Sequence, residues 1–148
     1  MRVQRLDHCS IRTTDLEATR RFYTEVVGLS VGPRPEFPFP GLWLYTSEEE
    51  MRAHHAVVHV VGIDPDDPAG LVEYLGDRDA ASLEGGGAVD HVAFWCSDLA
   101  GLRQRLRAGA IDFRERTVPT LALHQVFLED PSGVTLELNF SAGELEAA

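Results

Sequence analysis

The sequence predicts an α+β protein built from two similar βαβββ modules, and the main reason is one repeated dipeptide. Asp7-His8 and Asp90-His91 each follow an apolar residue and open a strand-like run that ends at a helix start. The two segments align at an offset of 83 residues, with Asp-His and a later Asp-Leu identical in both. Two copies of one supersecondary unit in 148 residues indicate a fold, and a functional site, built by pseudo-symmetry.

We expect module one over residues 4–62, beginning with a strand over 6–12. The Thr-Asp-Leu-Glu run at 14–17 has the form of a capping box and predicts the start of a helix, with Thr14 as the cap. Gly28 is placed to end this helix in a left-handed conformation. A short strand over 29–32 follows.

The second half of module one contains a proline-rich stretch, from Pro33 to Pro40. Its four prolines predict an ordered loop without helix, because proline removes a backbone donor and fixes φ. Strands over 42–46 and 56–62 complete the module, with the acidic run 48–50 as a solvated turn.

A linker over residues 63–87 connects the modules, with a helical turn at 71–75. Module two, over 88–140, repeats the plan: a strand over 89–95, a helix from the cap Ser97 to about Ala108, and strands over 111–116, 123–129 and 134–140. The Asp-Pro-Ser-Gly run at 130–133 predicts a tight hairpin turn. The tail, 141–148, is expected to fray, and residues 1–148 form one domain.

The closing strand of each module carries one side chain that can bind a metal, His59 in module one and Glu137 in module two. His59 follows His8 by 51 residues, and Glu137 follows His91 by 46. If the modules pack about a pseudo-twofold axis, these four side chains converge. Three imidazoles and a carboxylate suit one divalent metal ion per site, Zn or Ni first, with Fe(II) or Mn as alternatives.

The two-residue period of a strand predicts which side chains share a face with these ligands. Thr135 and Asn139 share the face of Glu137, whereas His124 has the opposite parity to its neighbour Gln125. Asp7 and Asp90 precede the histidines and are expected to be surface or strand-end anchors. The side chains expected to contact a substrate are Trp43, Tyr45, Gln125, Phe127 and Asn139.

The composition excludes some partners. Thirteen arginines and no lysine stand against 24 acidic residues, for a formal charge of −11, which disfavours nucleic acid and anionic membranes. With no apolar run long enough to cross a membrane and no secretory signal, we expect a soluble, cytoplasmic protein. Cys9 and Cys96 are expected to remain thiols.

Four stretches together resemble the vicinal oxygen chelate superfamily: Leu-Asp-His at 6–8, Phe-Tyr-Thr-Glu-Val-Val-Gly-Leu at 22–29, Val-Asp-His-Val-Ala-Phe at 89–94, and Asp-Pro-Ser-Gly-Val-Thr-Leu-Glu-Leu at 130–138. This superfamily includes glyoxalase I, methylmalonyl-CoA epimerase, fosfomycin-resistance thiol transferases, extradiol dioxygenases and bleomycin-resistance proteins. The resemblance covers residues 4–140 and implies paired modules that curl into a cup around a metal. Its ligand positions fall on His8, His59, His91 and Glu137.

Departures from the pattern of each subfamily affect the expected reaction. Glyoxalase I usually has glutamate, and the epimerase glutamine, where this chain has His59. Extradiol dioxygenases usually carry a tyrosine where this chain has Phe127, and no clear match to the potassium-binding loop of the fosfomycin enzymes occurs over 99–111. Bleomycin-binding members lack the metal ligands that this chain retains.

The resulting expectation is a metal-dependent enzyme of glyoxalase type, a lyase or isomerase, that acts on a small molecule with vicinal oxygens. Glu137 is its candidate catalytic residue, either as a ligand or as a proton carrier. An Fe(II) ring-cleaving dioxygenase and a small-molecule binding or resistance protein remain the alternatives. Exposed sheet edges, with the resemblance, imply a homodimer in which the ligands come from one chain or from both.

Overall fold

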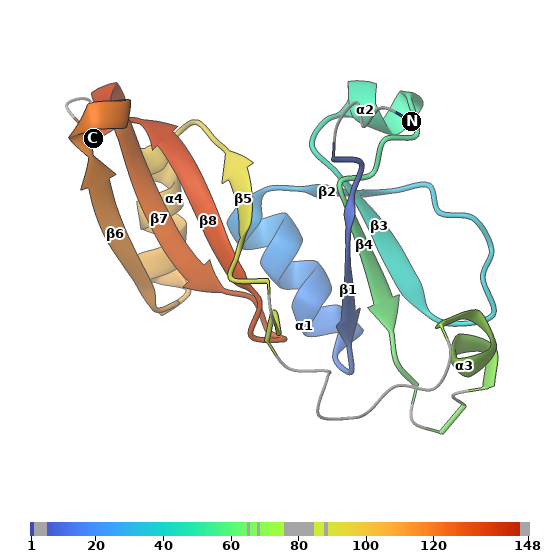
Figure 1. Cartoon of the computed structure of the whole chain (residues 1–148). Helices are drawn as coiled ribbons and strands as arrows, with labels where there is room; N and C mark the ends of the chain where they lie inside the picture. Colours follow the sequence, from blue (N-terminus) through green and yellow to red (C-terminus); the bar gives the residue numbers. More distant parts are fainter. Residues whose placement is uncertain (2–5, 65, 68, 76–84, 88, 146–148) are drawn as a thin grey trace. The chain divides into compact units, whose positions relative to one another are not determined.

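The computed structural model describes residues 1, 6–64, 66–67, 69–75, 85–87 and 89–145, and it divides the chain into two compact units, Met1–Leu83 and Glu84–Ala148. Each unit holds one four-stranded mixed sheet with helices (Figure 1). The α+β architecture with two βαβββ modules is therefore confirmed. The expectations for residues 4–5, much of the linker, residue 88 and the tail from 146 lie outside the described residues.

Module one has the strand order β1-β4-β3-β2. Its strands are β1 (Cys9–Thr13), β2 (Ser30–Gly32), β3 (Gly41–Tyr45) and β4 (Val58–Gly62). β1 runs parallel to β4, and β3 is antiparallel to both β4 and β2. Leu44, Val58 and Val60 are almost fully buried in the core of this module, together with Tyr23.

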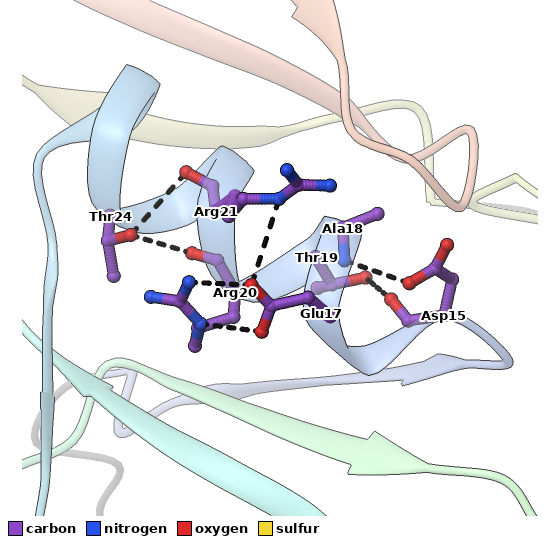
Figure 2. A network of polar contacts seen from close by, with 7 residues as sticks. All are labelled: Asp15, Glu17, Ala18, Thr19, Arg20, Arg21 and Thr24. Atoms are coloured by element: carbon purple, nitrogen blue, oxygen red, sulfur yellow. Dashed lines mark hydrogen bonds and ion pairs between the residues drawn. The ribbon is translucent and has the colours of Figure 1, made fainter.

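The helix of module one begins as α1 (Leu16–Arg21) and continues as a π-helix over Phe22–Val27. Asp15, not Thr14 as predicted, caps it by accepting a hydrogen bond from the Ala18 N–H at 2.8 Å (Figure 2). At the junction with the π-helix, the Thr24 hydroxyl donates to the Arg20 carbonyl at 2.9 Å. Phe22 and Tyr23, the first two residues of the π-helix, are both buried.

The Pro33–Pro40 loop contains neither helix nor strand, as predicted, and both of its ends are held. The Tyr45 hydroxyl donates to the Pro33 carbonyl at 2.6 Å, and the Gly62 N–H donates to the Pro40 carbonyl at 2.9 Å. Helix α3 (Ala69–Leu75) packs on the loop so closely at Gly70 that a Cβ there would meet the Pro38 carbonyl oxygen at 2.0 Å. The loop is thus fixed to the sheet and to α3.

Module two repeats this architecture with the strand order β5-β8-β7-β6. Its strands are β5 (Val92–Trp95), β6 (Phe113–Val118), β7 (Leu123–Glu129) and β8 (Thr135–Ser141). Helix α4 (Leu99–Ala108) covers one face of this sheet and buries three leucines at helical spacing (Figure 1). Short 3-10 turns follow β6 at Pro119–Leu121 and β8 at Ala142–Leu145.

The strand register shows how closely the modules correspond. Ser10 pairs with His59 across β1 and β4, and Ala93, 83 positions after Ser10, pairs with Glu137 across β5 and β8. Trp43 pairs with His59 in the neighbouring strand, and Phe127 pairs with Glu137. His59 and Glu137 therefore occupy equivalent positions in the two sheets, each next to an aromatic residue.

Further local predictions were wrong, among them the fraying from residue 141: Ser141 ends β8, and Ala142–Leu145 form a 3-10 helix. The opening strands begin one residue after the histidines, so His8 and His91 precede β1 and β5 instead of lying within them. The acidic run at 48–50 begins a short helix, α2 (Glu48–Arg52), because the Ser47 hydroxyl accepts the Glu50 N–H. Asp98, with positive φ, caps α4 in place of Ser97.

Two other findings concern the cysteines and the length of the helices. Neither cysteine of the chain, both of which lie among the described residues, forms a disulfide. In the described part of the chain no helix combines the length and the apolar character needed to cross a membrane.

Candidate functional site

Module one brings its two predicted ligands together. The His8 and His59 rings stack with their centroids 3.8 Å apart and their planes at 22°. The Trp43 indole stacks on His59 as well, at 4.0 Å and 4°. His59 thus has an aromatic ring on both sides, and its ring nitrogens at the edge are the atoms left to bind a ligand.

The surroundings of His59 determine its charge. Burial is the main cause that lowers the pKa of His59 from 6.5 to about 4, and the nearby positive charge of His8 lowers it further. Asp7 opposes this shift and raises the pKa. His59 is therefore a neutral imidazole at neutral pH, which is the form that binds a transition metal.

An aspartate orients each opening histidine. Asp7 Oδ2 lies 2.8 Å from Nδ1 of His8, and Asp90 Oδ2 lies 2.8 Å from Nδ1 of His91. This contact makes Nδ1 the nitrogen that faces the carboxylate and directs Nε2 away from it, the arrangement in which a carboxylate orients a metal-binding histidine. The aspartates are exposed, as predicted, but they contact the histidines themselves.

Module two brings its own pair of predicted ligands together. His91 Nε2, the nitrogen that faces away from Asp90, lies 3.5 Å from Oε2 of the buried Glu137. The Phe127 ring meets His91 edge to face, with centroids 6.4 Å apart. An imidazole nitrogen and a carboxylate oxygen thus point toward each other beside an aromatic wall.

A chain of amide groups holds the Glu137 carboxylate. Asn139 Nδ2 donates to Glu137 Oε1 at 2.8 Å, and Gln125 Nε2 donates to Asn139 Oδ1 at 3.0 Å. The Arg116 guanidinium in turn donates through Nε to Gln125 Oε1 at 2.9 Å. With Oε1 occupied by Asn139, Oε2 is the oxygen that remains for a metal or a proton.

The four predicted ligands are present as two pairs, one in each module. Within the described residues, no group of three histidine, cysteine, aspartate or glutamate side chains gathers closely enough to hold a metal. The chemistry of each pair nevertheless fits a transition metal: neutral His59, two histidines with Nε2 available, and a carboxylate with one open oxygen.

A cavity of about 440 Å³ adjoins the histidine pair of module one. It lies beneath the Pro33–Pro40 loop, and it is lined by His8, Ser10, Arg12, Arg34, Phe37, Phe39, Trp43, His59, Val60 and Val61. Trp43 therefore lies where a substrate-contacting residue is expected. Tyr45 does not line this cavity: its ring is fully buried over Gly32, and its hydroxyl holds the loop.

The predicted substrate residues of module two lie on one sheet face, where Gln125 and Asn139 support Glu137 and Phe127 flanks His91. A second cavity, of about 470 Å³, is lined by Phe127 and Thr135 together with Arg114, Asp112 and Glu129. Neither His91 nor Glu137 lines it. The cavity that contains predicted ligands is the one in module one.

His124 lies on the opposite face from Gln125, as its parity predicts, and its ring is buried beside polar side chains of β6. It is 4% exposed, with Nδ1 2.9 Å from the Thr117 hydroxyl. Nε2 makes no well-directed hydrogen bond, but it lies 3.3 Å from a Glu115 carboxylate oxygen. Glu115 is in turn bound by both Nε and Nη2 of Arg103, at 2.8 Å each.

Sequence reasoning missed three contributors. The repeated Asp-His dipeptide indicates that Asp7 and Asp90 could contact the histidines. Strand parity, in contrast, places the aspartates on the opposite face. Because both histidines precede their strands, that parity does not apply. Arg34 and Arg116 reach the site through contacts that no local pattern announces.

Comparison with known proteins gives one family. Residues 5–138 match the model of the Glyoxalase/Bleomycin resistance protein/Dioxygenase superfamily. A protein of Vibrio cholerae named "Probable lactoylglutathione lyase" is 25% identical over 136 residues, which cover 90% of this chain and 88% of that protein.

Solved structures show a similar fold at low sequence identity. A lactoylglutathione lyase from Agrobacterium tumefaciens has a TM-score of 0.59 at 18% identity, covering 93% of this chain and 94% of that chain. A genomically encoded fosfomycin resistance protein from Listeria monocytogenes has a TM-score of 0.60 at 13% identity, covering 94% of each chain.

Proposed function

Because the chain belongs to the glyoxalase/bleomycin resistance protein/dioxygenase superfamily, we propose that it is a metal-dependent enzyme, a glyoxalase-like lyase or isomerase. Its substrate is a small molecule with two vicinal oxygens. The observation that carries the proposal is the equivalence of His59 and Glu137 in the two sheets, each beside the opening histidine of its module. Glyoxalase-named relatives are consistent with this reaction type.

We assign His8, His59, His91 and Glu137 as the ligands of one divalent metal per site, Zn or Ni first. When bound, such an ion stabilises the negative charge that develops on two adjacent substrate oxygens. Asp7 and Asp90 hold the opening imidazoles with Nε2 available. The metal site then depends on side chains that are already oriented.

Glu137 is the residue we assign to proton transfer. Asn139 occupies Oε1, so for this role Oε2 would leave the metal and hold the proton, beside His91 Nε2. Burial of the carboxylate keeps water away from the oxygen, and the amide chain through Gln125 keeps the group in place. A positioned carboxylate of this kind can take a proton from one substrate carbon and return it to the neighbouring one.

Metal content and hemithioacetal activity test the proposal. Protein purified without added metal should contain about one divalent ion per chain by elemental analysis, and His91→Ala or Glu137→Ala should remove most of it. The exposed histidine variant His55→Ala serves as the matched control and should keep both metal and activity. Stoichiometric metal in both ligand variants would refute the assignment.

His59 separates the glyoxalase reaction from the second candidate, an Fe(II) ring-cleaving dioxygenase. That candidate would apply if His59 is not a ligand, because the ligands would then be two histidines and one carboxylate. His59→Glu should keep the metal and raise lactoylglutathione formation. Unchanged metal and activity in His59→Ala, with oxygen uptake on a catechol, would favour the dioxygenase.

A further inference from the structure

The cavity of module one contains a cation without an acidic partner. The Arg34 guanidinium donates through Nη2 to the Phe39 carbonyl at 3.0 Å and lies over the Phe37 and Phe39 rings, 4.8 and 5.2 Å from their centroids. Among the described residues, no carboxylate pairs with it, and none of those that line the cavity is acidic. In the part of the chain that the structure describes, the partners of this charge are therefore a carbonyl and two ring faces.

An unpaired cation in this position is costly. Arg34 is half-buried, and this burial lowers its pKa. By contrast, Arg20, Arg52 and Arg103 each pair with a glutamate. A ligand that brings its own negative charge would offset the desolvation of Arg34, because a guanidinium binds a carboxylate through two parallel hydrogen bonds.

The rest of the lining combines apolar side chains, Phe37, Phe39, Trp43, Val60 and Val61, with the polar His8, Ser10, Arg12 and His59. Phe37 stacks on Phe39 at 5.3 Å and 16°, and Phe37 meets Trp43 at 6.5 Å and 47°. Aromatic faces at these positions favour a flat ring as their partner. At about 30 Å³ for each water-sized group, the cavity has room for ~15 non-hydrogen atoms.

We propose that this cavity binds an aromatic carboxylate, with the carboxylate on Arg34 and the ring against Phe37, Phe39 and Trp43. The inference rests on the proposed function, since it names the substrate class of the same site. The ligand's ring extends along the wall toward the stacked pair of His8 and His59. Arg34 then selects for charge, and the aromatic residues select for a flat body.

Binding of 2-naphthoate, compared with its neutral amide, tests the proposal in the full-length protein. Calorimetry should show the carboxylate binding about tenfold or more tightly than 2-naphthamide, because a charge-assisted hydrogen bond is the difference between them. In a Trp95→Phe background, where Trp43 is the remaining tryptophan, 2-naphthoate should change the indole fluorescence. Equal affinity for the two compounds, or no binding of either at millimolar concentration, would overturn it.

Variants locate the carboxylate. Arg34→Met should abolish the preference for 2-naphthoate and Arg34→Lys should keep part of it, whereas the exposed control Arg52→Met should behave as the unchanged protein. Circular dichroism verifies that each variant is folded. If a variant fails to fold, the comparison of 2-naphthoate with 2-naphthamide in the unchanged protein still tests the proposal.

Repeating the titration after chelation with EDTA separates Arg34 from a bound metal. A preference for 2-naphthoate over 2-naphthamide that survives chelation supports the inference. A preference lost on chelation and unaffected by Arg34→Met overturns it, because the carboxylate would then sit on the metal. Metal binding and turnover without a preference for 2-naphthoate refute this inference alone, and the preference without metal refutes only the proposed function.

Discussion

At the residue scale, the stacking around His59 controls its protonation. Its ring lies between His8 and Trp43, so removing either neighbour changes a different cause of the lowered pKa. Trp43 contributes to burial, the larger cause, and His8 contributes charge, the smaller one.

We expect Trp43→Ala to raise the pKa of His59 from about 4 toward 6.5, and His8→Asn to raise it less. NMR titration of the His59 ring in metal-free protein measures both. Because the folded-state pKa lies below the unfolded value, the stability that depends on neutral His59 is complete above about pH 6.5 and declines as the pH falls toward 4. A larger rise in His8→Asn than in Trp43→Ala would contradict this order of causes.

The aspartates give a second residue-scale prediction. Asp90→Asn should weaken metal binding about tenfold, because the amide orients the His91 ring less strongly and makes Nε2 a weaker electron-pair donor to the metal. Asp7→Asn should act in the same direction. Competition with a chromogenic chelator measures the affinity, and Asp67→Asn, an exposed carboxylate in the linker, is the control. Unchanged affinity in Asp90→Asn would show that the contact is incidental.

At the element scale, the end of the first helix depends on one glycine. Gly28 has φ of 91°, and its N–H donates to the Tyr23 carbonyl at 3.1 Å to close the π-helix. Nothing lies within 4 Å of the position that a Cβ would occupy, so the requirement is one of backbone conformation alone.

Gly28→Ala should therefore lower the free energy of unfolding by about 1–2 kcal/mol, the cost of a left-handed conformation for a residue with a Cβ. Gly143→Ala, where the new Cβ meets only an ordinary 3.6 Å contact with Ser141, should change it by less than about 0.5 kcal/mol. Urea unfolding followed by circular dichroism compares the two. Equal effects would mean that the backbone at Gly28 relaxes.

At the scale of the whole molecule, exposed edges lead us to expect a homodimer. Within the described residues, β1 and β2 are the outer strands of the sheet in module one, and β5 and β6 are those of the sheet in module two. Trp95, on β5, is 71% exposed. Proteins protect or cover such edges and apolar side chains, and a twofold dimer is the commonest oligomer that can cover them.

Light scattering at micromolar concentration should therefore give the mass of a dimer, and a monomer mass would refute the expectation. Mixing inactive His8→Ala with inactive Glu137→Ala protein then shows where the ligands originate. If one site takes ligands from two chains, a mixed dimer holds one intact site and activity returns. Absence of recovery in a mixture proven to exchange subunits would indicate a site within one chain.

Much of the site could be anticipated from the sequence because its ligands lie at repeated positions in regular elements. The offset of 83 residues leads to His8 and His91, and the similar closing strands of the two modules lead to His59 and Glu137. The two-residue strand period then gives the face that Gln125 and Asn139 share, without knowledge of any contact. The helix end at Gly28 and the proline-rich loop could also be predicted from the sequence, since the backbone preferences of glycine and proline act locally.

The tertiary structure alone decided which residues distant along the chain come into contact. The stacking of Trp43 on His59, the burial of Tyr45 over Gly32, and the hydrogen bond from Arg34 to the Phe39 carbonyl each depend on which strand or loop packs beside another. The start of β1 one residue after His8 likewise reflects pairing with β4. Periodicity reports which way a side chain points, whereas its charge, its partners and its solvent exposure are set by neighbours that only the folded chain supplies.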